Sequence, residues 1–322
     1  MTTERIINVG VMGLGPNGRE HLKNYQRHPN ARVVAVCDAD EALARRVANE
    51  RGIANVYTDL GILDQKDIDM VAVCVPNPFH GEYTIRALEA GKHVFVEKPM
   101  ALEIESLRKI VRLSRKTGLH AMAGQVLRFL PLFRTIKHLI TEGIIGEIFY
   151  VEGDYIHDLR GYRHLEDPMG SDGVHPLDLL RWYVGEAVEV QAYSNRMIWP
   201  ELQDPTTVAI YRFASGCIGK VTVLWTPIGP RPTAFNISVY GSKATIRRDE
   251  ICLAGTDRFV PIGLDPTGHP FDEEDAHFID CLVQGREPLI NTLDGARSAA
   301  AVLVVKEAIR ERRPVSIPQL EE

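Results

Sequence analysis

Short apolar runs alternate with amphipathic stretches in the first part of the chain. Residues 6–12 and 67–75 are rich in β-branched and other apolar side chains, which is typical of strands buried on both faces of a parallel sheet. The same pattern predicts strands at 32–37, 94–96 and 119–123 and helices at 19–28, 40–51, 81–90 and 102–117. Because strands and helices alternate, we expect an α/β domain with a doubly wound parallel sheet, the Rossmann type, over residues 1–123.

The pattern changes after residue 123. A helix with an apolar face around residues 133–140 precedes predicted strands at 148–156, 188–196, 206–213, 217–225, 235–240 and 244–248, and closing helices at 272–284 and 293–310. No helix separates the last four strands, so they are expected to form an antiparallel sheet. Residues 124–322 therefore predict a second domain, of the α+β class.

A glycine-rich turn joins the first predicted strand to the first helix. In Gly13-Leu-Gly-Pro-Asn-Gly18, Gly13 permits a tight turn, Gly15 lets the backbone approach a pyrophosphate, and Gly18 allows close packing of helix on strand. Pro16 and Asn17, within the same turn, are further candidate cofactor contacts, and the helix that follows offers free N–H groups and the positive end of its dipole to the phosphates. With a strand before the turn and a helix after it, these residues indicate a dinucleotide-binding site.

Polar residues follow two other strands of this predicted sheet. Asp38 lies twenty residues after Gly18, which is the spacing of the acid that binds the adenosine ribose hydroxyls. Because an aspartate there repels a 2′-phosphate, we predict NAD rather than NADP; the alternative is a capping acid at a strand end. Asn77 and His80 lie on a loop at the same sheet edge, where they either contact the cofactor or cap the loop.

The predicted strand 94–96 ends in Glu97, Lys98 and Pro99. Pro99 cannot donate to a sheet ladder, so the strand must stop there, and its ring keeps Lys98 extended. A lysine at the carboxyl end of a strand lies where open α/β sheets bind ligands. Lys98 is therefore a candidate catalytic residue, and Glu97 and Lys98 are candidate cofactor contacts. The alternative is a surface ion pair beside a turn.

The stretch 170–185 of the second domain holds the other catalytic candidates. Pro176 is well placed as the first residue of a helix, and Asp172, His175 and Asp178, spaced by three, could share one side of a turn. At a helix start the dipole would keep the His175 ring neutral, so that it could accept a proton from an alcohol. A helix that begins at Ser171 would weaken this argument, and a capping role for His175 is the alternative.

Several motifs together resemble the Gfo/Idh/MocA family, named for glucose–fructose oxidoreductase, inositol dehydrogenase and MocA. They are the glycine motif, Asn77-Pro-Phe-His80, Gly91-Lys-His-Val-Phe-Val-Glu-Lys-Pro99, the Gly…His-x-x-Asp…Trp stretch, Arg128-Phe-Leu-Pro131, Gly146-Glu-Ile148 and Arg313-Pro-Val-Ser-Ile-Pro318. The resemblance covers nearly the whole chain. It implies a Rossmann domain, a second domain with an open, mostly antiparallel sheet that is often buried in oligomers, and oxidation or reduction of a sugar, inositol or similar polyol.

The resemblance also implies roles for single residues. Lys98 would hydrogen-bond the reacting hydroxyl, His175 would be the general acid/base, and Asp178 would bind substrate or orient the histidine. Many polyol dehydrogenases of the family carry an aspartate four residues before the histidine, where this chain has Ser171. Either Asp172, three before, takes the catalytic place, or His175 acts without it.

Substrate contacts are further expected from a polar stretch before this motif and from one earlier arginine, namely Tyr155, His157, Arg160, Tyr162, Arg163 and Arg128. The alternative is a solvated loop with surface ion pairs. Trp225 is expected to pack rather than to bind sugar. No HExxH or CxxC spacing is present, so no metal site is predicted.

Composition excludes other classes of protein. The net charge is −6 and no run of five basic residues occurs, so nucleic-acid binding is not expected. No apolar run is long enough to span a bilayer, and the five cysteines are scattered, so we expect a reduced, cytoplasmic protein that does not bind membranes.

The sequence thus predicts an NAD-dependent dehydrogenase of a small polyhydroxylated substrate, assembled as a homodimer or homotetramer. Two alternatives remain open at this point. One is a non-catalytic protein that senses NAD and sugar, and the other is an NAD-dependent enzyme that cleaves glycosides through a transient redox step.

Overall fold

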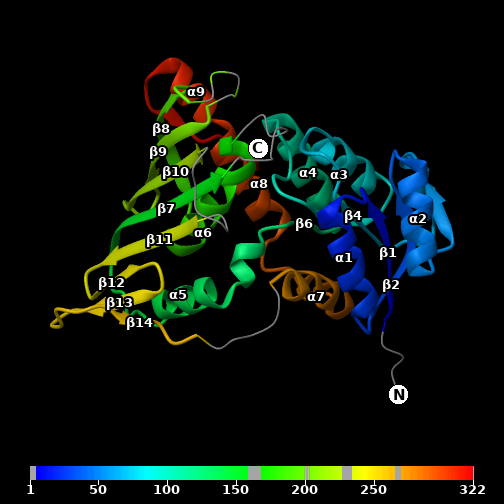
Figure 1. The fold of residues 1–322 in the computed structure, drawn as a ribbon, viewed down its shortest axis with the longest axis horizontal. Coiled ribbons are helices and arrows are strands. Elements are labelled where there is room, and N and C mark those ends of the chain that lie inside the picture. Colours follow the sequence, from blue (N-terminus) through cyan, green and yellow to red (C-terminus); the bar gives the residue numbers. More distant parts are fainter. Residues whose placement is uncertain are drawn as a thin grey trace. The chain divides into compact units, whose positions relative to one another are not determined.

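The computed structural model (Figure 1) describes residues 5–158, 168–198, 200, 202, 204–226, 234–264 and 270–321. Internal contacts divide the chain into two compact units. The first comprises Met1–Phe129, Gly268–Arg297 and Leu320–Glu322, and the second comprises Leu130–Thr267 and Ser298–Gln319. The chain therefore returns to the first unit before the last strand of the second unit's sheet, at Val315–Ser316, is added.

The first unit is built on a six-stranded sheet with the strand order β3-β2-β1-β4-β5-β6. All neighbouring strands pair in parallel, which confirms the predicted Rossmann sheet. The strands are β1 (Ile7–Met12), β2 (Ala31–Cys37), β3 (Asn55–Tyr57), β4 (Met70–Val73), β5 (His93–Val96) and β6 (Ala121–Ala123). The order reverses between β1 and β4, which in such sheets is where ligands bind beyond the carboxyl ends of the strands.

Amphipathic helices accompany this sheet. They are α1 (Pro16–Arg27), α2 (Glu41–Arg51), α3 (His80–Glu89) and α4 (Ile104–Thr117), with short 3₁₀ turns at η1 (Leu60–Asp64), η2 (Asn77–Phe79) and η3 (Val126–Phe129). Helix α1 begins three residues earlier than predicted, because Pro16 has the fixed φ that suits the first helical position. Helix α7 (Pro270–Gln284), which we expected in the second domain, packs against α1 in this unit.

The second unit is built on a nine-stranded sheet with the order β14-β13-β12-β11-β7-β10-β9-β8-β15. The strands are β7 (Ile148–Asp158), β8 (Ala187–Asn195), β9 (Thr206–Phe213), β10 (Ile218–Thr226), β11 (Ala234–Gly241), β12 (Ala244–Arg247), β13 (Glu250–Leu253), β14 (Val260–Pro261) and β15 (Val315–Ser316). The sheet is mostly antiparallel, as predicted. However, β7 lies between β10 and β11 and pairs in parallel with β10, so the last four predicted strands do not form one antiparallel run.

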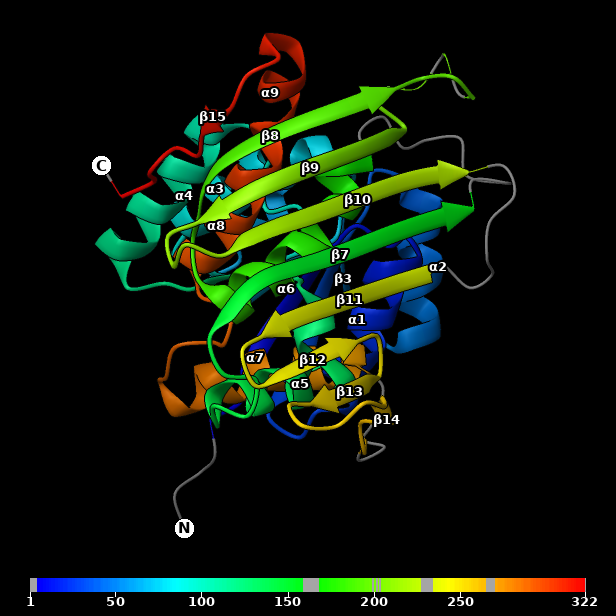
Figure 2. The ribbon, with the colours of Figure 1, turned by 90° about the vertical axis from the view of Figure 1, so that its left-hand side faces the viewer.

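One face of this sheet is packed against helices, and Figure 2 looks onto its other face. Helix α6 (Val174–Val184) packs on β7, where Gly153 leaves room for it: a Cβ at this position would lie 2.7 Å from the Cβ of Pro176. The unit also holds α5 (Pro131–Thr141) and α9 (Val305–Glu311), and α8 (Thr292–Leu303) begins in the first unit and ends in the second. No helix in the part of the chain described here is long and apolar enough to cross a bilayer.

Candidate active site

A pocket of about 650 Å³ opens in the first unit beyond the carboxyl ends of β1, β2 and β4. The wall of this pocket includes five of the predicted cofactor-binding residues, namely Gly13, Gly15, Pro16, Asn17 and Asp38. The remaining lining residues are Cys37, Ala39, Leu43, Thr58, Asp59, Cys74, Val75, Pro76, Phe79 and Tyr83. Cys37, Ala39 and Phe79 lie in or next to the stretches singled out above, whereas Leu43, Thr58, Asp59 and Tyr83 carry no local signal that could have identified them.

The glycine-rich turn leaves its backbone open to this pocket. Gly13 has φ +87°, and a Cβ there would collide with the carbonyl of Cys74. A Cβ on Gly18 would collide with the carbonyl of Gly13, so only glycine fits at either position. At Gly15, by contrast, an added Cβ would meet no described atom within 4 Å. A phosphate can therefore approach the backbone at Gly15, beside the N-terminus of α1.

Two aspartates give the pocket a negative end. The carboxylate of Asp38 accepts the N–H of Leu14 at 2.7 Å and that of Asp40 at 2.9 Å, so both of its oxygens are held by backbone. Asp59 lines the same pocket and accepts the N–H of Gly61 at 2.9 Å. Burial, together with these two carboxylates, raises the pKa of the Cys37 thiol to about 12. A further negative group such as a 2′-phosphate is disfavoured beside these two carboxylates.

Strand β5 delivers Glu97 to a buried position and Lys98 to a half-buried one, with a cis peptide bond between Lys98 and Pro99. One oxygen of Glu97 accepts from the side-chain amide of Asn17 at 3.1 Å and lies 3.1 Å from Nε2 of His21. The other oxygen accepts the N–H of Lys98 at 3.1 Å. Although burial opposes ionisation, the hydrogen bond from His21 holds the pKa of Glu97 at about 2.

His80 and Asn77 lie next to this strand end. His80 is buried at the start of α3, and its two ring nitrogens lie 2.7 Å from the carbonyl oxygens of Pro99 and Val75. Burial lowers the pKa of His80, while the two backbone carbonyls oppose this effect. His80 thus ties the end of β4 to the segment after Lys98, while Asn77 is half-buried in η2.

The helix that carries the second set of candidates begins earlier than Pro176. A π-helical turn, η4 (Met169–Gly173), leads directly into α6, and Pro176 is the third residue of α6. The expectation that Pro176 begins the helix is therefore wrong. A wider turn with i→i+5 bonding accommodates a proline ring, which would collide with a carbonyl in a regular helix. Since His175 does not lie at the helix start, the dipole argument for its neutral ring does not apply.

Four predicted residues nevertheless lie together in the second unit. The ring of Tyr155 stacks on that of His175, with centroids 5.8 Å apart, and Asp172 lies 3.5 Å from Nδ1 of His157. The indole of Trp225 donates to the same carboxylate of Asp172 at 2.7 Å. Trp225 is buried, as a packing residue should be, but its contact with Asp172 was not foreseen.

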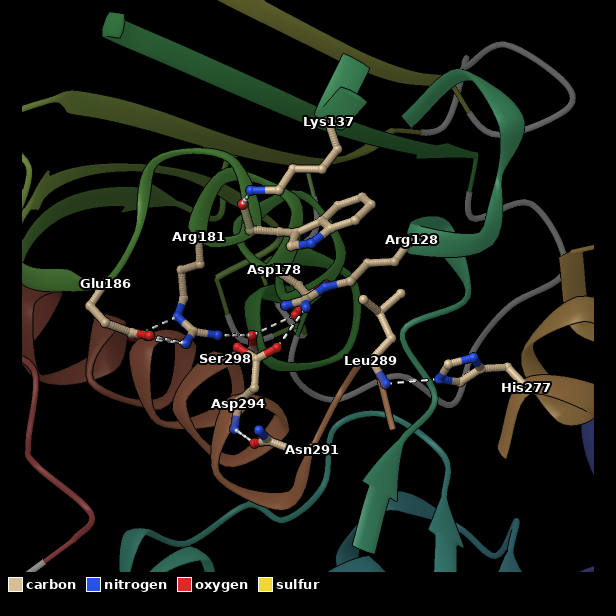
Figure 3. A network of polar contacts seen from close by, with 11 residues as sticks. Arg128, Lys137, Asp178, Arg181, Glu186, His277, Leu289, Asn291, Asp294 and Ser298 are labelled. Atoms are coloured by element: carbon tan, nitrogen blue, oxygen red, sulfur yellow. Dashed lines mark hydrogen bonds and ion pairs between the residues drawn. The ribbon is translucent and has the colours of Figure 1, made fainter. Parts of the chain in front are cut away.

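Asp178, one turn further along α6, is buried and engaged by protein groups (Figure 3). Its carboxylate accepts the hydroxyl of Ser298 at 2.7 Å. Arg181 also donates to Ser298 and makes a bidentate contact with Glu186, at 2.9 and 2.8 Å. This network anchors α6 to α8.

Of the candidate substrate-binding arginines, the structure describes Arg128. Arg128, in η3 of the first unit, is buried and forms an ion pair with Asp294 at 2.6 Å (Figure 3). Asp294 in turn donates its N–H to the side chain of Asn291 at 2.9 Å. Arg160 and Arg163 lie outside the described residues, as does Tyr162. Among the residues that are described, no three His, Cys, Asp or Glu side chains gather as metal ligands would.

Two family models match the chain. One, described as an oxidoreductase family with an NAD-binding Rossmann fold, matches residues 7–125, and the other, the GFO/IDH/MocA C-terminal domain, matches residues 133–247. The chain is 28% identical to scyllo-inositol 2-dehydrogenase (NAD(+)) of Bacillus subtilis, over 98% of this chain and 97% of that protein. It is 25% identical to myo-inositol 2-dehydrogenase of Thermotoga maritima, over 98% and 99%.

A solved structure agrees with these relatives. Levoglucosan dehydrogenase, in complex with NADH and levoglucosan, superposes with a TM-score of 0.88 at 25% identity, over 98% of this chain and all of that one. The similarity therefore extends over both units of the chain.

Proposed function

Because the chain belongs to the Gfo/Idh/MocA oxidoreductase family, we propose that it is an NAD-dependent dehydrogenase of a sugar, an inositol or a related polyol. The proposal that the chain uses NAD rests on one observation, the pocket in which an open glycine-rich turn faces the fixed carboxylate of Asp38. The substrate class rests on the relatives, which are named for inositols and levoglucosan.

The residues of the pocket fit NAD. The backbone at Gly15 and the start of α1 would hold the pyrophosphate, and Asp38 would bind the hydroxyls of the adenosine ribose. Asn77 remains a candidate contact at the same edge. NAD, when bound, supplies the acceptor for a hydride, while the protein supplies binding, orientation and charge.

The proposed chemistry assigns the proton to the protein. As the carbinol C–H bond breaks and its electron pair leaves as hydride, the hydroxyl loses its proton to a ring nitrogen of His175. The Lys98 ammonium hydrogen-bonds the same oxygen and stabilises the charge that develops on it. Stacking on Tyr155 orients the ring of His175.

Several further groups are proposed to bind the polyol. Asp172 and His157, which face each other beside Trp225, present a carboxylate and an imidazole to substrate hydroxyls. Asp178, Arg128, Arg160 and Arg163 also remain proposed substrate-binding residues. Since Asp178 and Arg128 already have protein partners, we expect them to act mainly by fixing the local backbone.

We further propose that residues 1–123 act as the NAD-binding domain and residues 124–322 as the substrate-binding and assembly domain. The open face of the nine-stranded sheet would form a homodimer or homotetramer. On that face, Ile210 of β9 and Ile218 of β10 are about half exposed, and Lys220, which lies opposite Ile210 in the sheet, pairs with Glu152 of β7 at 2.9 Å. Exposed apolar side chains beside an ion pair suit a surface that a second copy covers.

The test is NADH formation by purified protein and NAD with a panel of inositols, aldoses, anhydrosugars and chromogenic glycosides. We expect reduction of NAD by at least one inositol or sugar with free hydroxyls. Release of an aglycone without NADH would favour glycoside cleavage instead. NAD binding with no turnover across the panel would favour a sensor.

A further inference from the structure

We propose that His21 is a positioning residue: together with Asp275 it holds Glu97, and through Glu97 it sets the backbone at Lys98 and the side chain of Asn17. This inference rests on the proposed role of Lys98. It concerns three charged residues of the first unit that are distant in sequence and contribute no atom to the wall of the cofactor pocket as described.

The three side chains form a continuous chain of contacts. Nδ1 of His21 lies 2.8 and 3.0 Å from the two oxygens of Asp275, and Nε2 lies 3.1 Å from Glu97. His21 lies on α1, Glu97 at the end of β5 and Asp275 on α7. The imidazole thus joins the helix that follows the glycine-rich turn to the strand that delivers Lys98.

The cluster is charged although it is buried. His21 is 0% exposed, Asp275 1% and Glu97 7%. A carboxylate only accepts hydrogen bonds, so a ring that bonds two carboxylates carries a proton on both nitrogens. The carboxylates accordingly raise the pKa of His21 well above 6.5, against the effect of burial. Breaking one partner of such a buried set leaves an uncompensated charge, so its geometry is strongly enforced.

The far side of the cluster is fixed as well. Asn24, one turn along α1 from His21, donates to Asp275 at 2.9 Å. The ring centroids of Phe95 and Phe271 lie 4.7 and 5.4 Å from that of His21, so the imidazole also packs against apolar surface. His21 therefore has no freedom to turn away from Glu97.

Glu97 passes this constraint to the reacting end of the strand. The oxygen that meets His21 also accepts from Asn17, which lines the cofactor pocket, and the other oxygen accepts the N–H of Lys98. The carboxylate thus bridges a cofactor-pocket residue and the backbone of the proposed catalytic lysine. With His21 removed, Glu97 loses its cationic partner, and the peptide before Lys98 loses its fixed direction.

A second histidine offers a matched control. His28, at the C-terminal end of α1, lies 3.5 Å from Asp280, which is also on α7. That pair joins the same two helices, but it is exposed on the aspartate side and does not touch Glu97. Replacing His28 therefore tests the joining of α1 to α7 alone.

The experiment is a double-mutant cycle measured by enzyme kinetics on the full chain, with NAD and the most active substrate of the panel proposed above. His21→Gln, Lys98→Ala and the double variant are compared by kcat, by KM for substrate and by the directly titrated Kd for NAD. We expect His21→Gln to lower kcat at least tenfold with a smaller change in substrate KM, because small misplacements of a catalytic group are costly. In the Lys98→Ala background, measured at high enzyme concentration, the same change should alter the residual rate less than about twofold.

Asp275→Asn preserves the shape of its side chain and stands in for His21→Gln should the latter not fold. Asp275→Asn should lower kcat by a smaller factor than His21→Gln, again only when Lys98 is present. His28→Gln should leave kcat unchanged. A loss of kcat that is equal with and without Lys98 would overturn the inference, as would an unchanged kcat in both His21→Gln and Asp275→Asn. Full activity of Lys98→Ala would refute the proposed role of Lys98, and with it the inference about His21.

Discussion

At the scale of single residues, Asp38 is held in place by the protein before any cofactor binds. Two backbone N–H groups fix its carboxylate, and Asp59 adds a second acid to the same pocket. We therefore predict that Asp38→Ser weakens NAD binding without giving useful NADP activity. The additional change Asp59→Ser should be required before NADP is accepted, since one negative charge remains until then. Ratios of kcat/KM for NAD and NADP measure this, and efficient use of NADP by Asp38→Ser alone would contradict it.

The Asp172 carboxylate gives a second prediction at this scale. It accepts from Trp225 at 2.7 Å and faces His157 at 3.5 Å. Trp225→Phe removes the donor but keeps most of the ring, so Asp172 should lose its orientation while the core stays filled. We expect a rise in substrate KM with an unfolding temperature within a few degrees of that of the native chain. A KM that does not change would show that Asp172 does not contact substrate.

The buried carboxylate of Glu97 makes stability depend on pH. The pKa of Glu97 in the folded protein, about 2, lies below the ordinary value of 4.5. The contribution of the ionised carboxylate to the free energy of unfolding is therefore present above pH 4.5 and is lost as pH falls towards 2. A shift of this size corresponds to about 3 kcal/mol. The gap in unfolding free energy between the native chain and Glu97→Gln should therefore narrow between about pH 5 and pH 3. Glu82→Gln, at an exposed ion pair, serves as the control, and a gap that is constant with pH would refute the argument.

At the scale of elements, local signals in the sequence predicted what is local in the structure. The apolar runs of β1 and β4 and the glycine-rich turn identified the Rossmann sheet and its pocket. Strand β3 was missed because it has three residues and is partly exposed. The π turn before α6 was missed because Pro176 looks like a helix start in any sequence pattern.

Contacts between distant residues could not be predicted in this way. His21 and Asp275 are 254 positions apart, and nothing near either residue in the sequence indicates the other. The parallel pairing of β7 with β10 was missed for a similar reason, because alternation of side chains shows which face of a strand is buried but not which strands are its neighbours. Of the candidate site, the motif residues were therefore found and their supporting partners were not.

The contact of α6 with β7 supports a prediction at the element scale. Gly153→Val would place a branched side chain where Pro176 already lies and push α6, with His175, away from the sheet. We expect a loss of about 1–3 kcal/mol in unfolding free energy. Gly263→Ala, at a position where no described atom lies within 4 Å of an added Cβ, is the control. Equal stability of Gly153→Val and the native chain would mean that this close approach is not real.

At the scale of the whole molecule, each unit carries one part of the proposed reaction. The first unit has the cofactor pocket and Lys98, and the second has His175 and the open sheet face. If that face forms the assembly, Ile210→Glu with Ile218→Glu should shift the protein to a smaller species in light scattering. Ile6→Glu, at an exposed isoleucine of the first unit, should not. A native chain that is monomeric would refute the proposed oligomer without affecting the proposed reaction.

The central claim, that this chain transfers a hydride to NAD with Lys98 at the reacting oxygen, is tested most directly by one comparison. Single-turnover formation of NADH from the best substrate is measured for the native chain, for Lys98→Ala and for Lys109→Ala, a lysine that forms an exposed ion pair with Glu89. We predict that Lys98→Ala slows the hydride step at least a hundredfold with NAD still bound, whereas Lys109→Ala proceeds at the native rate. A native rate in Lys98→Ala would contradict the account.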